Sequence, residues 1–213
     1  MTVFFPHEAL AGRLLPLVAG GDDGSHDVGH LSRVWANARV IAVAEGGDSE
    51  VLAAAVLLHD CVHVEKSSAL RSQASRLAAE RGRAILAGLG WAQARIDAVA
   101  HAIEAHSFSA AIAPTTLEAR ILQDADRLEA IGAIGVARCF YTAGRMGSAL
   151  YDADDPRGER RGLDDRAFAI DHFRTKLLTL EGGFQTPAGA RLARERTQFL
   201  ADFLAAFEAE IGA

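Results

Sequence analysis

The eight histidines of this chain are its best candidates for transition-metal binding, because neutral imidazole is the commonest metal ligand in proteins. His59 and Asp60 stand side by side at the end of the apolar run LAAAVLLHD, which would bring an imidazole and a carboxylate to the end of a buried helix. Helical neighbours point about 100° apart, so both reach one ion only at a helix end or with the ion between them. On these two residues alone, a packed core histidine beside a C-terminal polar residue is the commoner explanation.

Two further stretches carry ligand types. His26 and His30 lie four residues apart and share one helical face, so their spacing leaves open which of them would bind a metal. Asp124 and Asp126 lie two residues apart, about 200° around a helix, so they cannot both face the same point. The apolar periodicity around them slightly favours Asp124 as the inward carboxylate.

The segment CVHVEKSSALRSQAS follows the His59–Asp60 pair and has the residue types of a phosphate-binding segment. Lys66 and Arg71 supply cations, and several serines precede the N-terminus of the next expected helix, an end that attracts anions. A solvated helix cap with two surface cations explains the same residues equally well.

The elements that position these residues are predicted to be helices. Alanine, leucine and arginine dominate, and the alternating Val, Thr and Tyr runs typical of strands are missing. About eight helices are expected, over residues 7–19, from a cap at Ser25 or Asp27 to 45, and over 50–60, 71–87, 91–106, 117–142, 165–180 and 187–211. The segment 144–165 is rich in Asp, Arg, Gly and Pro and is predicted to be a long exposed loop. We therefore expect one all-α domain over 1–213, with a core over about 25–142 and C-terminal helices over 165–211.

Composition excludes several classes of protein. The chain has 213 residues, 50% of them hydrophobic and 23% charged, which is typical of a packed domain and not of a disordered one. Its net charge of −6 argues against a protein that coats nucleic-acid polymers. The longest apolar run, Val51–Leu58, is far short of the ~20 residues that span a bilayer. No secretory signal or disulfide framework is expected, so we expect a soluble, cytoplasmic protein without membrane partners.

The order His30, His59, Asp60 and Asp126 resembles the HD-domain superfamily of metal-dependent phosphohydrolases. The stretches that carry the resemblance are GHLSRVW, AAVLLHD and QDADRLEAIGAIGVARCF. The stand-alone bacterial HD hydrolases are similar again at HAIEAHSFS, DHFRTKLLTLEGGFQT and ARERTQFLADFL, so the likeness covers about residues 25–210. The resemblance implies an HD-type helical bundle and a divalent metal ion held by these four side chains.

The same resemblance implies further roles. It favours His30 over His26, and it overrules the helical periodicity in favour of Asp126. The residues it places beside the ligands are Arg33, Asp124 and Arg127. The residues expected to contact the substrate are Lys66, Arg71, His106, His172 and Lys176, of which the last two would share one face of the helix over 165–180.

The proton-transfer residues are less clearly marked. Asp60 could take the proton of the attacking water or bridge a second ion. Several HD hydrolases carry a carboxylate pair just after the doublet, but this chain has His63, Val64 and Glu65 there. The resemblance therefore leaves three alternatives for the general acid: His63, Glu65 or another residue.

The implied ligand set determines the expected chemistry. Two imidazoles and two carboxylates suit Mn, Fe, Co, Ni or Zn, and suit Mg less well. The resemblance implies hydrolysis of a phosphate ester or phosphoanhydride bond in a small phosphorylated metabolite, first of all a nucleotide, by a triphosphate pyrophosphohydrolase or a nucleotidase. A metal- and nucleotide-binding regulatory module without turnover is the alternative. No nucleic-acid polymer is an expected partner, and a homodimer is a possible assembly.

Overall fold

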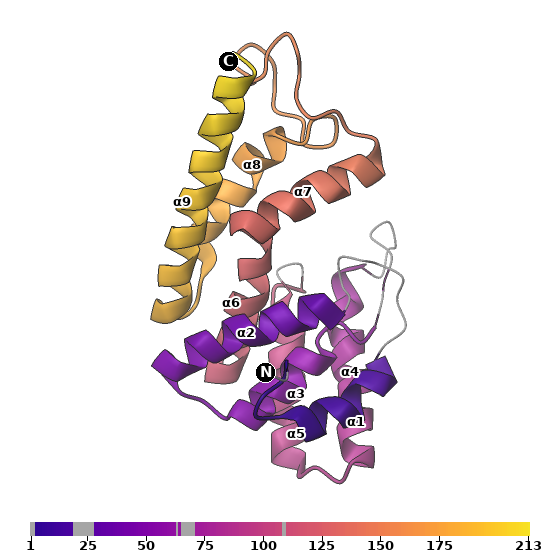
Figure 1. The fold of residues 1–213 in the computed structure, drawn as a ribbon. Helices are drawn as coiled ribbons and strands as arrows, with labels where there is room; N and C mark the ends of the chain where they lie inside the picture. Colours follow the sequence, from indigo (N-terminus) through magenta and orange to yellow (C-terminus); the bar gives the residue numbers. More distant parts are fainter. Residues whose placement is uncertain (1–2, 19–27, 63, 65–70, 108–109) are drawn as a thin grey trace. The chain divides into compact units, whose positions relative to one another are not determined.

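A computed structural model describes residues 3–18, 28–62, 64, 71–107 and 110–213. Within these ranges the regular elements are nine α-helices and several 3-10 helices (Figure 1), and an isolated β-bridge joins Ala149 to Phe168. The chain forms two compact units, residues 1–126 and 127–213. The all-α prediction is confirmed. Among the described helices, none is both long and apolar enough to cross a membrane.

The first unit is built around α3 (Ser49–Leu58). Every residue from Val51 to His59 is buried, as expected for a helix that is apolar on all sides. Helices α1, α2 and α5 pack against α3, and α4 pairs with α5. The bounds of these helices are α1 Glu8–Val18, α2 Val28–Glu45, α4 Ala74–Gly88, α5 Gln93–His106 and α6 Leu117–Arg127.

The N-terminus of α3 is fixed by polar contacts. The Asp48 carboxylate accepts hydrogen bonds from the backbone amides of Glu50 and Val51 and so caps the helix. Arg95 of α5 donates to Asp48 at 3.0 Å and to Glu50 at 2.6 Å. These contacts set the start of α3 against α5, and the His59–Asp60 pair follows at the opposite end.

The single long helix expected over 117–142 is wrong. Helix α6 ends at Arg127, a 3-10 turn covers Leu128–Ala130, and α7 begins at Gly132 and runs to Met146. Ile131 is extended, and Gly132 has a φ of +72°, a left-handed conformation that favours glycine. Ile131 and Gly132 therefore interrupt the helix that the sequence predicted over 117–142.

The helix expected over 165–180 is also shorter than predicted. Helix α8 covers only Asp171–Thr175, and the 3-10 helix η4 (Leu177–Gly183) follows it. Residues 167–170 instead bond across the loop: Ala149 donates to Ala167, and Ile170 donates to Leu150. Because these backbone groups pair across the loop, they do not enter a helix.

The long loop is found close to its predicted place, from 147 to 170, since α7 continues to Met146. Aspartates organise it: the Asp155 carboxylate accepts from the backbone amides of Glu159, Arg160 and Arg161. Carboxylate side chains that bond nearby backbone amides stabilise tight turns. The aspartates that the sequence shows in this segment are thus part of its internal structure.

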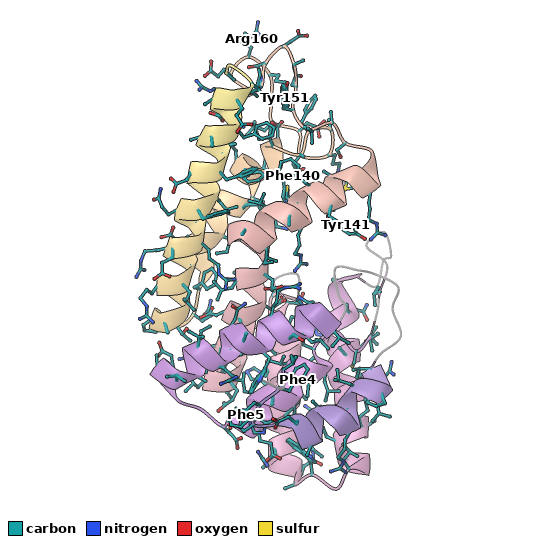
Figure 2. All side chains as sticks on the ribbon, in the orientation of Figure 1. Phe4, Phe5, Phe140, Tyr141, Tyr151 and Arg160 are labelled. Carbon is teal, nitrogen blue, oxygen red and sulfur yellow. The ribbon has the colours of Figure 1, made fainter. Side chains whose placement is uncertain are left out.

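An aromatic cluster forms the core of the second unit. Phe173 of α8 stacks on Phe203 of α9 (Pro187–Glu210) at a ring-centroid distance of 5.7 Å. The ring centroid of Phe140 of α7, which is labelled in Figure 2, lies 6.1 Å from that of Phe173 and 6.0 Å from that of Phe203. Phe207, one turn after Phe203, extends the cluster to Tyr151 of the loop. These rings hold α7, α8 and α9 together.

Candidate metal centre

Three helices of the first unit end around one group of side chains. Helix α3 ends at Leu58, directly before His59 and Asp60, and α5 ends at His106. Asp126 occupies the last turn of α6. The carbonyl ends of helices carry partial negative charge, so their convergence favours a bound cation. His30 joins the group from the first turn of α2.

The four expected ligands lie within a few ångströms of one another. The Nε2 atoms of His30 and His59 are 3.3 Å apart. Asp60 Oδ2 lies 3.7 Å from Nε2 of His30 and 3.4 Å from Nε2 of His59. Asp126 Oδ1 lies 3.5 Å and 3.8 Å from the same two nitrogens. The structure thus brings together residues from α2, from α6 and from the end of α3.

These spacings suit a divalent transition metal. Two donors that each lie about 2.1 Å from one ion are about 3.0 to 3.4 Å apart in octahedral or tetrahedral geometry. The distance between the imidazole nitrogens falls in this range, and the carboxylate distances exceed it by a few tenths of an ångström at most. Donor atoms of His30, His59 and Asp60 all lie within 4.8 Å of one another. A mixed nitrogen and oxygen set of this kind fits Mn, Fe, Co, Ni or Zn.

The group is closed on one side and open on the other. His30 and His59 are each only 1% exposed, whereas the carboxylates of Asp60 and Asp126 are 33% and 31% exposed. His59 Nδ1 donates to the carbonyl of Val56 at 2.8 Å, which fixes the ring and leaves Nε2 for an ion. A substrate could therefore approach from the carboxylate side.

The environment of His59 raises its pKa. Burial by itself lowers the pKa, but the Asp60 carboxylate, together with Asp126 and the Val56 carbonyl, outweighs burial and raises the pKa of His59 to about 9. Without a metal, this imidazole is therefore protonated at neutral pH. A divalent cation must displace that proton, because a metal binds the neutral imidazole.

His106 faces the same group in a different protonation state. Its Nδ1 donates to the Ile103 carbonyl at 2.6 Å, and its Nε2 lies 3.9 Å from Asp60 Oδ1. Burial, and then the nearby charge of His59, lower the pKa of His106. His106 thus presents a neutral Nε2 beside Asp60, and its contact with substrate stays a prediction.

His101, on the same helix, has a structural contact. Its Nε2 accepts a hydrogen bond from the Thr115 amide at 3.0 Å.

Asp126, not Asp124, is the carboxylate beside the imidazoles. Asp124 is fully buried, so the helical periodicity correctly identified the more buried residue. Its preference for Asp124 as the site carboxylate was wrong, because the site lies at the partly exposed end of the helix. The sequence resemblance favoured Asp126, and its role as a metal ligand stays a prediction.

Several predicted residues cannot be placed. His26, His63, Glu65, Lys66 and the side chain of Arg71 lie outside the described residues. Three roles therefore stay predictions: a place outside the ligand set for His26, proton donation by His63 or Glu65, and phosphate contact by Lys66 and Arg71.

Arg33 and Arg127, which the resemblance places beside the ligands, are among the described residues. Arg33 is partly buried on α2. Arg127 donates to the Gly183 carbonyl, and its guanidinium lies 5.8 Å from the centre of the Phe184 ring. That Arg33, Arg127 and Asp124 orient the ligands stays a prediction.

The two substrate contacts predicted in the second unit lie at α8. His172 belongs to α8, and Lys176 is its C-terminal cap, whose amide donates to the His172 carbonyl at 3.1 Å. His172 Nδ1 lies 2.9 Å from Asp165 Oδ2, and the Thr175 hydroxyl donates to the same oxygen. The shared face of His172 and Lys176 and their contact with substrate stay predictions.

Two buried amide residues near the site, Asn37 and Gln123, were missed by the sequence reasoning. Asn37 exposes 7% of its surface and Gln123 exposes 6%. Asn37 lies seven residues after His30 and therefore on the same helical face, which is the signal that could have pointed to it.

Comparison with known proteins agrees with this geometry. The family model for the HD domain matches residues 27–131. YpgQ of Bacillus subtilis strain 168, an uncharacterised protein, is 34% identical over 194 residues, which are 89% of this chain and 86% of YpgQ.

Solved structures are similar over nearly the whole chain. An HD-superfamily hydrolase from Bacillus thuringiensis has a TM-score of 0.75 at 27% identity, over 97% of this chain and 98% of its own. The structure of B. subtilis YpgQ in complex with ADP has a TM-score of 0.73 at 30% identity, over 96% and 97%. With its His30, His59, Asp60 and Asp126 cluster, this chain belongs to the HD-domain superfamily and has the fold of an HD-superfamily hydrolase.

Proposed function

We propose that this protein is a metal-dependent phosphohydrolase that cleaves a phosphoanhydride or phosphate ester bond in a nucleotide. The observation that carries the proposal is the convergence of the His30 and His59 imidazoles with two partly exposed carboxylates. YpgQ, which matches most of this chain, has been crystallised with ADP. That complex supports a nucleotide as the ligand class here.

The four side chains would share the work of holding a divalent ion. His30 and His59 supply nitrogen donors from the buried side, and Asp60 and Asp126 supply oxygen donors from the exposed side. Such an ion, when bound, activates water near neutral pH and polarises a phosphoryl oxygen. The fixed His59 ring and the ends of the surrounding helices keep the donors in place for that role.

Asp60 and His106 are the described groups best placed to handle protons. Asp60 turns Oδ2 toward the two ligand imidazoles and Oδ1 toward His106. A carboxylate beside a reacting water can accept its proton as a general base. His106 Nε2, held as an acceptor by the bond from Nδ1 to Ile103, can receive a hydrogen bond from the same water or from substrate.

A nucleotide panel tests the proposal. Protein stripped with a chelator and reloaded with Mn²⁺ or Co²⁺ is incubated with nucleoside mono-, di- and triphosphates, and phosphate and pyrophosphate are measured separately. Monophosphate plus pyrophosphate from a triphosphate identifies a pyrophosphohydrolase, and phosphate from a monophosphate identifies a nucleotidase. Asp60→Asn should abolish turnover, whereas Asp97→Asn, on the exposed face of α5, should not. Absence of turnover with every metal and nucleotide would contradict the proposal.

A binding module without turnover is the second candidate. It is favoured by the residues after the doublet, where His63 and Glu65 stand in place of the carboxylate pair of several HD hydrolases. In that case ADP with Mn²⁺ would raise the melting temperature while no product forms. Product that disappears in Asp60→Asn would exclude this candidate.

A further inference from the structure

Asn37 links the helix that carries His30 to the backbone that carries Asp126. It lies two turns after His30 on α2, and its Nδ2 donates to the Ala125 carbonyl at 3.1 Å. Ala125 directly precedes Asp126, and its carbonyl belongs to the last turn of α6. Carbonyls of a last helical turn have no partner within their own helix, so they need a donor from elsewhere.

Gln123 supplies a second link from the same end of α6. It lies one turn before Asp126, and its Nε2 donates to the Ala105 carbonyl of α5 at 2.7 Å. Ala105 is in the last turn of α5, where carbonyls again need outside donors. The last two turns of α6 are therefore bonded to both α2 and α5.

Hydrophobic packing does not explain these two amides. Each is at least nine-tenths buried, and an amide loses favourable hydration when it is buried. Leucine at position 37 or methionine at position 123 would fill similar volume without that loss. A directional hydrogen bond does what an apolar contact does not, because it favours one register between two helices.

We propose that Asn37 and Gln123 are positioning residues, which hold the end of α6 so that the Asp126 carboxylate meets the two imidazoles. This inference rests on the proposed metal site. Asp126 Oδ1 lies 3.5 Å from His30 Nε2 and 3.8 Å from His59 Nε2, with the carboxylate on a final helical turn. Final turns fray readily, and a frayed turn would carry Asp126 away from the imidazoles.

Cobalt binding tests the proposal without any need for turnover. Asn37→Leu and Gln123→Met each remove the donor at nearly constant volume. Metal-free protein is titrated with Co²⁺, and its visible absorption, which reports the geometry of the ligands, is recorded. We expect each variant to raise the Co²⁺ dissociation constant about tenfold and to change the spectrum at saturation.

The matched control is Gln198→Met. Gln198 is exposed on α9 and donates to Asp202 at 2.9 Å, so this variant should keep the wild-type affinity and spectrum. If Asn37→Leu fails to fold, the milder Asn37→Ser replaces it, and Gln123→Met tests the second link.

The outcomes separate the two claims. A variant pair with lower melting temperatures but wild-type Co²⁺ affinity and spectrum would show a structural role only and overturn the positioning role. Failure of the wild-type protein to bind Co²⁺ would overturn the proposed metal site and the positioning role with it.

Discussion

The Nε2 atoms of His30 and His59 lie 3.3 Å apart, although the residues are 29 positions apart in the chain. Two imidazoles held this close and almost fully buried leave little room for water between them. The Nδ1 atom of His59 is bonded to the Val56 carbonyl, and its Nε2 atom faces Nε2 of His30. A cation that binds both nitrogens would therefore join two segments of the chain that are distant in the sequence.

The metal-free protein should lose stability as the pH rises from about 6.5 to 9. The pKa of His59 in the folded protein, about 9, exceeds its ordinary value of 6.5. The folded state therefore binds this proton more tightly than the unfolded state, and that contribution to stability is fully present below pH 6.5 and lost as the pH passes 9. Urea unfolding of chelator-treated protein across this range measures the effect.

The matched variant for this pH effect is His59→Gln. Its unfolding free energy should change less across the same pH range, since the titrating group is gone. If wild type and His59→Gln show the same pH dependence, the assignment to His59 fails.

Asp126→Asn should act mainly on metal affinity, and Asp124→Asn should act mainly on thermal stability. Asp126→Asn removes a charged donor beside both imidazoles, so the affinity for Mn²⁺ should fall about tenfold or more while the fold is kept. Asp124→Asn changes a fully buried residue outside the four expected ligands, so it should lower the melting temperature and weaken metal binding less than Asp126→Asn does. Calorimetric titration with Mn²⁺ and thermal unfolding distinguish them; equal loss of metal in both variants contradicts the choice of Asp126.

Much of this centre could be predicted from the sequence, for identifiable reasons. The apolar run before His59 made a fully buried helix whose end carries the site. Periodicity was misleading at Asp124, because it measures burial along a helix and this site lies at helix ends. Asn37 and Gln123 were missed because their roles depend on carbonyls 88 and 18 positions away, which no local pattern shows.

Two helices were predicted too long because tertiary structure overrides local sequence preference. Gly132 lies inside the helix expected over 117–142, but it takes a left-handed conformation that ends a regular helix. The segment before Asp171 looked helical, but its backbone pairs with Ala149 and Leu150 instead. In both places the backbone conformation or pairing in the folded chain overrides a local helical preference.

Two glycines of α7 should respond oppositely to alanine. A Cβ at Gly135 would lie 2.4 Å from the carbonyl oxygen of Ala130, whereas a Cβ at Gly144 meets nothing within 4 Å. Gly135→Ala should therefore destabilise the protein by about 1 to 3 kcal/mol through overpacking. Gly144→Ala should stabilise it by about 0.5 kcal/mol, because alanine favours the helix. Urea unfolding followed by circular dichroism measures both, and equal effects would contradict the packing described at Gly135.

Replacing Arg161 should make the second unit less stable to unfolding. Asp171 is fully buried and accepts two hydrogen bonds from the Arg161 guanidinium, at 2.5 and 3.0 Å, and one from the Asp164 amide. Arg161→Met leaves a buried carboxylate without its cation, so it should lower the free energy of unfolding. The double variant Arg161→Met/Asp171→Leu should recover part of that loss. A single variant with wild-type unfolding free energy would show that this ion pair contributes little.

The most direct test of the metal centre is the anomalous diffraction of a crystal grown with Co²⁺. The account predicts an anomalous peak about 2.1 Å from Nε2 of both His30 and His59, with Asp60 and Asp126 completing the protein ligands. A peak held by other residues, or no peak at this position in protein saturated with Co²⁺, would contradict it.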